Sequence, residues 1–116
     1  MSLTIRDLLE KQRAFDEKHS GDIPFFVEID EKNLPELEHL LVCLLGELGE
    51  FSNILKKVRR GDLSLDIAKK ELDEELVDVF IYLLKIAGQF GVDLEEGYEK
   101  KMEKNALKFR GFERNA

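Results

Sequence analysis

The chain is poor in the residues that several protein classes depend on. Cys43 is its only cysteine, which excludes an intramolecular disulfide and a metal cluster built on cysteines. The chain has 18 basic and 25 acidic residues, and its net charge of -7 disfavours duplex nucleic acid as a partner. No apolar run approaches the ~20 residues that cross a bilayer, and no signal-peptide pattern opens the chain. We therefore expect a cytoplasmic protein with no membrane partner.

What the chain does contain is typical of a globular, helix-rich protein. Of its 116 residues, 37% are charged and 43% are hydrophobic. This length predicts one domain, residues 1–116, with an N-terminal helix and loop over about 1–33 and a core over about 34–109. A domain of this size buries a modest core, so association with further copies would help to cover apolar surface.

Apolar periodicity and capping residues predict four helices. The first spans about residues 4–19, and residues 20–33 form a loop with Gly21 and Pro24. The second helix opens at Asn33 and Pro35 and ends near residue 60, before Gly61. The third follows Ser64 and ends at residue 88 or 91, and the fourth runs over about 93–109. We therefore predict an all-α fold, a helical bundle of about four helices that oligomerisation completes.

Two pairs of acidic residues lie at helical i, i+3 spacing inside apolar segments. Glu47 and Glu50 form the first pair, and Glu75 and Asp78 form the second. Residues at this spacing share one face of a helix, where like charges repel each other. The short turn near Gly61 would fold the two helices antiparallel and bring all four carboxylates to one place. A divalent cation would remove the repulsion.

The ligand set predicts which cation would bind. Carboxylate oxygens without His or Cys favour Mg²⁺, with Mn²⁺ as an alternative, over Zn²⁺. A di-iron centre of the ferritin type fits poorly, because neither His19 nor His39 lies at the required spacing from the acidic pairs.

Three motifs together resemble a known family. The spacing of Glu47 and Glu50, followed by that of Glu75 and Asp78, resembles the paired Glu-x-x-Glu and Glu-x-x-Asp signature of the MazG-like, all-α nucleoside triphosphate pyrophosphohydrolases. The segment from Lys101 to Phe109 is similar to the Lys-x-x-x-Asn-x-x-Lys/Arg-aromatic motif that closes many family members. The resemblance covers about residues 38–109.

This resemblance implies a function. It implies Mg²⁺-dependent hydrolysis of a nucleoside triphosphate between the α and β phosphates, which yields a monophosphate and pyrophosphate, in a homodimer or homotetramer. It also implies that Lys101, Asn105 and Lys108 contact the substrate. The resemblance further implies that the acidic residues serve as metal ligands and catalytic groups, namely Glu47, Glu50, Glu75 and Asp78.

The residues of the closing motif agree with that role on physical grounds. Lys101, Asn105 and Lys108 follow an i, i+4, i+7 course and form one stripe on a helix. A polyphosphate is repelled by carboxylates unless cations intervene, so a basic stripe opposite the acids would suit the substrate. No recognisable motif falls in the first thirty-odd residues, where base or sugar selectivity could be set.

Simpler interpretations stand beside these. Acidic residues of a charged helical protein commonly form a solvated face, and Glu71, Asp73 and Glu74 fit that description better than that of primary ligands. His19 and His39 are expected at the surface. The functional alternative is a non-catalytic helical module that retains the fold and binds a protein partner through its amphipathic faces.

Overall fold

The protein is described by a computed structural model, which places residues 2–114. Within this part the chain forms four α-helices, α1 (Ile5–Glu17), α2 (Leu34–Arg59), α3 (Leu65–Phe90) and α4 (Leu94–Lys108), and a short 3-10 turn, η1 (Arg110–Phe112). No β-strand occurs in residues 2–114, where the only bridge is an isolated one between Ser20 and Pro24. The predicted all-α class is confirmed.

Local capping explains where the helices begin and end. Thr4 and Asp7 close a reciprocal capping box at the start of α1. Ser64 accepts a hydrogen bond from the Ile67 N–H at the start of α3, as expected of an N-cap. Gly91 ends α3 with φ 78°, a conformation that a residue with a Cβ rarely adopts. The observed bounds lie within about two residues of the predicted ones.

The connection between the first two helices has no regular structure. The first helix ends at Glu17 and not near residue 19, because the Lys18 N–H already bonds to the carbonyls of Phe15 and Asp16. His19 then stacks on the Phe15 ring at 4.2 Å and faces Phe25 at 5.8 Å. The chain therefore leaves the helix early and turns back toward α3.

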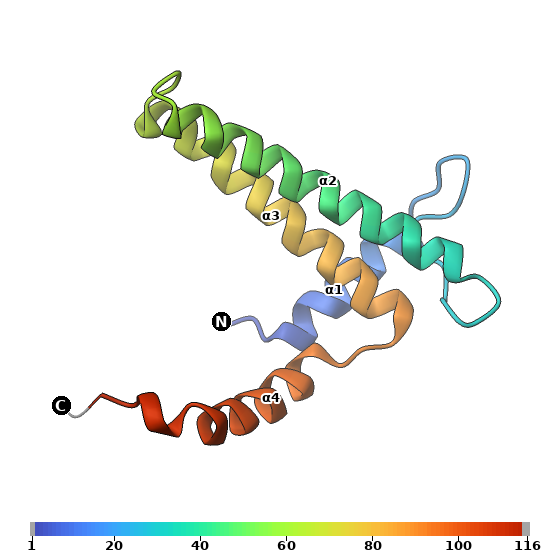
Figure 1. The fold of residues 1–116 in the computed structure, drawn as a ribbon. Helices are drawn as coiled ribbons and strands as arrows, with labels where there is room; N and C mark the ends of the chain where they lie inside the picture. Colours follow the sequence, from blue (N-terminus) through green and yellow to red (C-terminus); the bar gives the residue numbers. More distant parts are fainter. Residues whose placement is uncertain (1, 115–116) are drawn as a thin grey trace.

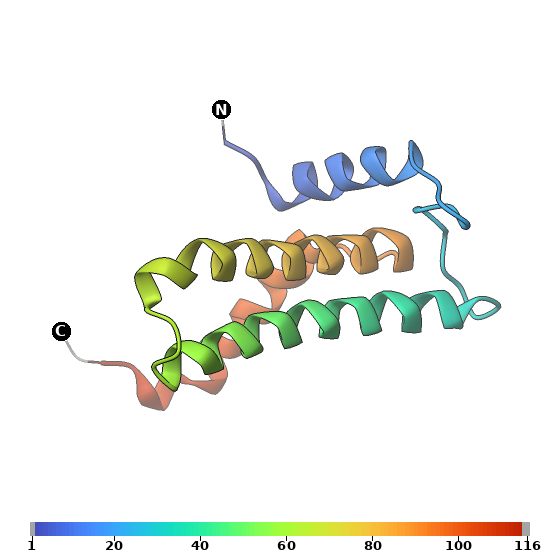
Figure 2. The ribbon, with the colours of Figure 1, turned by 90° about the horizontal axis from the view of Figure 1, so that it is seen from above.

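The two long helices form an antiparallel hairpin that is the centre of the fold. Figures 1 and 2 show α2 and α3 side by side along their whole length, joined by the turn at Gly61. Ile54, Ala68 and Leu72 form a buried core near this turn, with Phe51, Val58 and Leu63 packed around it. The helix α1 packs on α3 at the opposite end of the hairpin.

The last helix is separate from the hairpin. Its main contacts are with α1 and η1, and Arg6 of α1 donates to Asp93, the N-cap of α4, at 2.9 Å. Asp93 also accepts a hydrogen bond from the Glu96 N–H and so caps the start of this helix. Figure 1 shows α4 diverging from α2 and α3 toward the C-terminus. One chain therefore leaves the outer faces of its helices open.

Candidate metal centre

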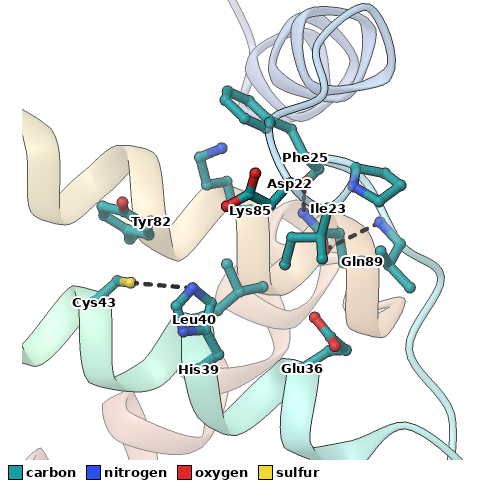
Figure 3. Close-up of a pocket in the computed structure, with 13 residues that line it drawn as sticks. Asp22, Ile23, Phe25, Glu36, His39, Leu40, Cys43, Tyr82, Lys85 and Gln89 are labelled. Atoms are coloured by element: carbon teal, nitrogen blue, oxygen red, sulfur yellow. Dashed lines mark hydrogen bonds between the residues drawn. The ribbon is translucent and has the colours of Figure 1, made fainter.

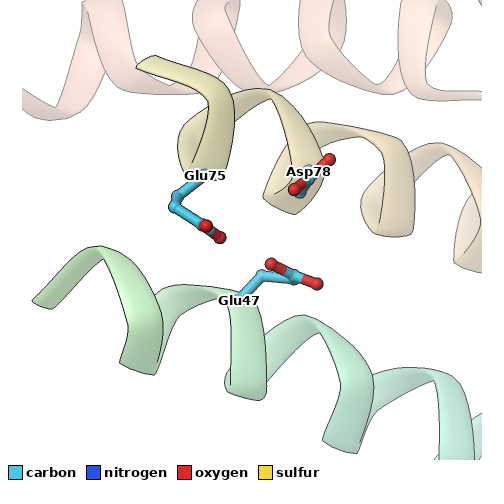
Figure 4. Close-up of side chains that lie close together, drawn as sticks. All are labelled: Glu47, Glu75 and Asp78. Carbon is cyan, nitrogen blue, oxygen red and sulfur yellow. The ribbon is translucent and has the colours of Figure 1, made fainter. Parts of the chain in front are cut away.

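The facing sides of α2 and α3 bring three carboxylates together. Glu47 projects from α2, and Glu75 and Asp78 project from α3. One oxygen of each residue lies within 4.8 Å of the others, and all three side chains are half-buried. Figure 4 shows Glu47 and Glu75 extending toward each other across the space between the helices. We call these three residues the carboxylate cluster.

Local sequence explains why the cluster forms here. Glu75 and Asp78 are one turn apart on α3, so their side chains leave the same side of that helix. The buried Leu72 lies one turn before Glu75 and packs against Ile54 of α2, which holds the two helices in register. The acidic residues are therefore placed by the same contacts that form the core.

Glu50 lies beside the cluster. It is exposed, yet its carboxyl is within hydrogen-bonding reach of Glu75 when one of the two is protonated. The contacts with Glu50 and then Glu47, burial, and repulsion from both charges raise the pKa of Glu75 to about 7. Near neutral pH, this site in the absence of metal retains a proton that an isolated glutamate would have lost.

Two buried atoms of the cluster have no hydrogen-bond donor when its carboxylates are all ionised. They are one carboxylate oxygen of Glu47 and one of Glu75. Buried polar atoms are nearly always paired, and an unpaired carboxylate oxygen is costly. A hard divalent cation fits this donor set, because it would bind both oxygens and relieve the repulsion between the charges. The arrangement therefore suits Mg²⁺ or Mn²⁺.

The closing-motif residues lie elsewhere in the chain. Lys101 and Lys108 are exposed on α4, and Asn105 is half-buried there. The ammonium of Lys108 lies 5.3 Å from the centre of the Phe109 ring. Since α4 packs mainly on α1 and diverges from the hairpin, the contacts within one chain do not bring this stripe to the carboxylate cluster. The basic stripe would reach the acidic residues, as predicted, only from another copy of the chain or after a movement of α4.

Sequence reasoning missed two residues that adjoin the cluster. Tyr82 follows Asp78 by one turn, and Cys43 precedes Glu47 by one turn. Burial raises the pKa of the Tyr82 phenol, and the neighbouring Cys43, Glu47 and Asp78 add to that rise. Tyr82 had the pattern of an edge residue and Cys43 that of a small core residue. Their i, i+4 distance from the acids was the signal that could have identified them.

The fold and the cluster define an all-α protein with a candidate divalent-metal centre, and comparison with curated proteins points to a class of enzymes. Over 89 residues the chain is 30% identical to dCTP pyrophosphatase 1 of Mus musculus, and equally so to the proteins of that name from Rattus norvegicus and Homo sapiens. The matched segment covers 73% of this chain and 52% of each relative, so the chain spans about half the length of these relatives.

Other comparisons do not extend this similarity. No family model matches the sequence, and no solved structure matches it. The similarity therefore points to nucleotide pyrophosphatases in general, the same kind of enzyme that the motif resemblance implies. Membership of the MazG-like family, the extent of the domain and the roles of the acidic and basic residues stay predictions.

Proposed function

We propose that this chain is a Mg²⁺-dependent nucleoside triphosphate pyrophosphohydrolase that cleaves between the α and β phosphates. The observation that carries the proposal is the pair of unpartnered buried oxygens of Glu47 and Glu75 in a cluster with Asp78. The similarity to proteins named dCTP pyrophosphatase 1 supports the same reaction and suggests dCTP as a first substrate to test.

In this proposal the acidic residues hold the metal. The cluster and Glu50 would bind Mg²⁺, which supplies charge neutralisation at the phosphates and favours ionisation of water. Glu75 would give up its proton on loading, because a bound cation reverses the repulsion that raises its pKa. Glu50 would then be placed to accept a hydrogen bond from an attacking water, since it is the exposed acid at the rim of the site.

We propose further that the enzyme works as a homodimer or homotetramer. Helical spacing places Leu41, Leu45 and Leu48 on one stripe of α2, where they are 47%, 55% and 39% exposed. A second exposed stripe, on α3, consists of Leu76, Phe80 and Leu83. Apolar surface of this extent is characteristic of an interface. In an oligomer, Lys101, Asn105 and Lys108 of one copy would be free to serve the cluster of another.

A hydrolysis assay tests the reaction. The protein is incubated with ribo- and deoxyribonucleoside triphosphates, dCTP included, and Mg²⁺, and pyrophosphate and orthophosphate are measured separately. We expect monophosphate and pyrophosphate in equal amounts. Glu47→Gln and Asp78→Asn should lower the rate at least 100-fold, whereas Glu74→Gln, an exposed neighbour on α3, should leave it unchanged. Orthophosphate as the only product would contradict cleavage between the α and β phosphates.

The alternative function is a non-catalytic interaction module. The exposed apolar stripes of α2 and α3 favour it, since they would equally accept a helix of another protein. If no triphosphate of the panel were hydrolysed and Mg²⁺ did not change the Tm, the interaction module would be the better explanation. The cytoplasmic location expected from the sequence stays a prediction.

A further inference from the structure

Little of the surface of the last helix is covered by the rest of the chain. No residue of α4 is buried, and its apolar residues Tyr98, Met102 and Leu107 are 64%, 46% and 65% exposed. Its main contacts beyond η1 are with α1, and Figure 1 shows it running away from the hairpin. Apolar packing within one chain therefore does little to fix the direction in which α4 points.

Ion pairs with α1 hold the first turn of α4. One guanidinium nitrogen of Arg6 donates to Asp93 at 2.9 Å, and the other lies 3.5 Å from a carboxylate oxygen of Glu95. Asp93 is also the N-cap of α4, so the same carboxylate joins the start of this helix to α1. A planar guanidinium that spans two carboxylates sets their orientation as well as their distance. Arg6 therefore constrains the direction of α4.

The length of α4 converts a small change at its start into a large one at the basic stripe. At about 1.5 Å per residue, Lys101 lies about 12 Å and Lys108 about 22 Å beyond Asp93 along the helix. A tilt of about 10° at Asp93 would thus move the Lys108 end by about 4 Å. A displacement of about 1 Å is enough to weaken the positioning of a substrate. The stripe can therefore serve a substrate well only if the start of α4 is held.

We propose that Arg6 is a positioning residue of the reaction: it fixes the direction of α4 and thereby presents Lys101, Asn105 and Lys108 to the triphosphate. This inference rests on the proposed function, in which these three residues contact the substrate. It applies whether the stripe serves the carboxylate cluster of its own chain or that of another copy, because Arg6 sets the direction of its own α4. Arg6 itself does not touch the substrate.

The kinetics of Arg6 variants test this role. Arg6→Gln should raise KM for the triphosphate that is hydrolysed by about two- to fivefold and change kcat less than about twofold, because an exposed ion pair biases the direction of α4 by no more than that factor. Arg6→Lys should lie between the two, since an ammonium cannot hold both carboxylates in one fork. Arg60→Gln is the matched control: Arg60 pairs with Asp62 at 2.9 Å in the turn between α2 and α3, its side chain is 54% exposed against 55% for Arg6, and both constants should stay unchanged.

A charge reversal shows whether the ion pairs are the cause. Arg6→Glu should raise KM by about tenfold or more, because it places a further carboxylate beside Asp93 and Glu95. Adding Glu95→Arg should return KM to within about fivefold of the wild type, since the new guanidinium can pair with the new carboxylate. A double variant no better than Arg6→Glu alone would overturn the ion pairs as the source of the effect.

The direction of α4 can also be measured without catalysis. Spin labels on Ser52→Cys of α2 and Lys104→Cys of α4, both exposed positions, report one distance by pulsed electron paramagnetic resonance in a Cys43→Ser background. Dilution into unlabelled protein leaves only distances within one chain. We expect a narrow distribution that Arg6→Gln broadens and Arg60→Gln leaves unchanged. Equal widths in all three proteins would overturn the inference.

The outcomes separate this inference from the proposed function. If Lys101→Ala raises KM and Arg6→Gln does not, the role of Arg6 is overturned and the reaction stands. If the protein hydrolyses no triphosphate and Arg6→Gln still broadens the distance distribution, the reaction is overturned and the control of α4 by Arg6 is supported.

Discussion

Asp16 of α1 accepts a hydrogen bond from the Lys85 ammonium of α3 at 2.8 Å, and the two side chains are only 1% and 14% exposed. Gln12 donates to the same oxygen of Asp16 at 3.1 Å. This ion pair connects the N-terminal helix to the hairpin, and the same Lys85 ammonium lies 5.3 Å from the centre of the Phe25 ring. It therefore holds α1 and the following loop against α3.

Removing one partner of this pair should destabilise the fold. We expect Asp16→Ala to lower the free energy of unfolding by about 3 kcal/mol, because it leaves the Lys85 charge withdrawn from water and unpaired. The measurement is urea unfolding followed by circular dichroism. Asp73→Ala is the control, since Asp73 pairs with Lys69 at the surface of α3, and its loss should stay below about 1 kcal/mol. Equal losses for the two variants would contradict a special role for the Asp16 pair.

Mg²⁺ should stabilise the protein through the carboxylate cluster. At a concentration ten times its Kd, Mg²⁺ should raise Tm by about 5 °C, because it binds only the folded state. Glu47→Gln and Asp78→Asn should abolish this rise and should raise the Tm of the metal-free protein, since each removes repulsion. Thermal scans in EDTA and in Mg²⁺ measure both effects. Glu74→Gln should respond as the wild type does, and an unchanged Tm of the wild type in Mg²⁺ would argue against a metal site.

The raised pKa of Glu75 predicts how stability depends on pH without metal. Folding raises this pKa from its usual 4.5 to about 7, so between these values the folded state holds a proton that the unfolded chain has lost. The contribution of this proton is fully present below pH 4.5 and disappears as the pH rises through 7. In EDTA, the difference in unfolding free energy between pH 5 and pH 8 should therefore shrink in Glu75→Gln. Glu74→Gln should retain the wild-type difference.

The apolar stripes predict an oligomer that charge would disrupt. Leu45→Glu or Leu83→Glu should reduce the mass measured by light scattering after size exclusion, because each places a carboxylate in the proposed interface. Leu107→Glu is the control, since Leu107 is 65% exposed on α4 and belongs to neither stripe. A wild-type protein that runs as a monomer at micromolar concentration would contradict this prediction.

The helices were predictable because their boundaries depend on neighbouring residues. Ser64, Gly61 and Gly91 act within one or two turns of their own positions, and the sequence states their types directly. The approach of the acidic residues to one another was also predictable, because Glu75 and Asp78 share a helix face and a short turn returns the chain alongside Glu47. Periodicity and a tight connection were enough for both.

The hollow between the loop of residues 21–27 and the helices α2 and α3 (Figure 3) could not be predicted from the sequence, because long-range contacts form it. Asp16 meets Lys85, and Gln89 meets the backbone of Phe25 and Val27, across more than sixty residues of chain. No local pattern marks such partners. The position of α4 also depends on long-range contacts: within one chain the helix that carries Lys101, Asn105 and Lys108 packs mainly on α1, and the role of this stripe stays a prediction.

By itself, the sequence determined four helices, their ends and the acidic faces of two of them, because capping and periodicity act over a few residues. Only the tertiary structure decided that two carboxylate oxygens are buried without partners, that a pocket adjoins them, and that α4 stands apart. The reason is that burial depends on which distant segments meet, and those meetings follow from the packing of the whole chain.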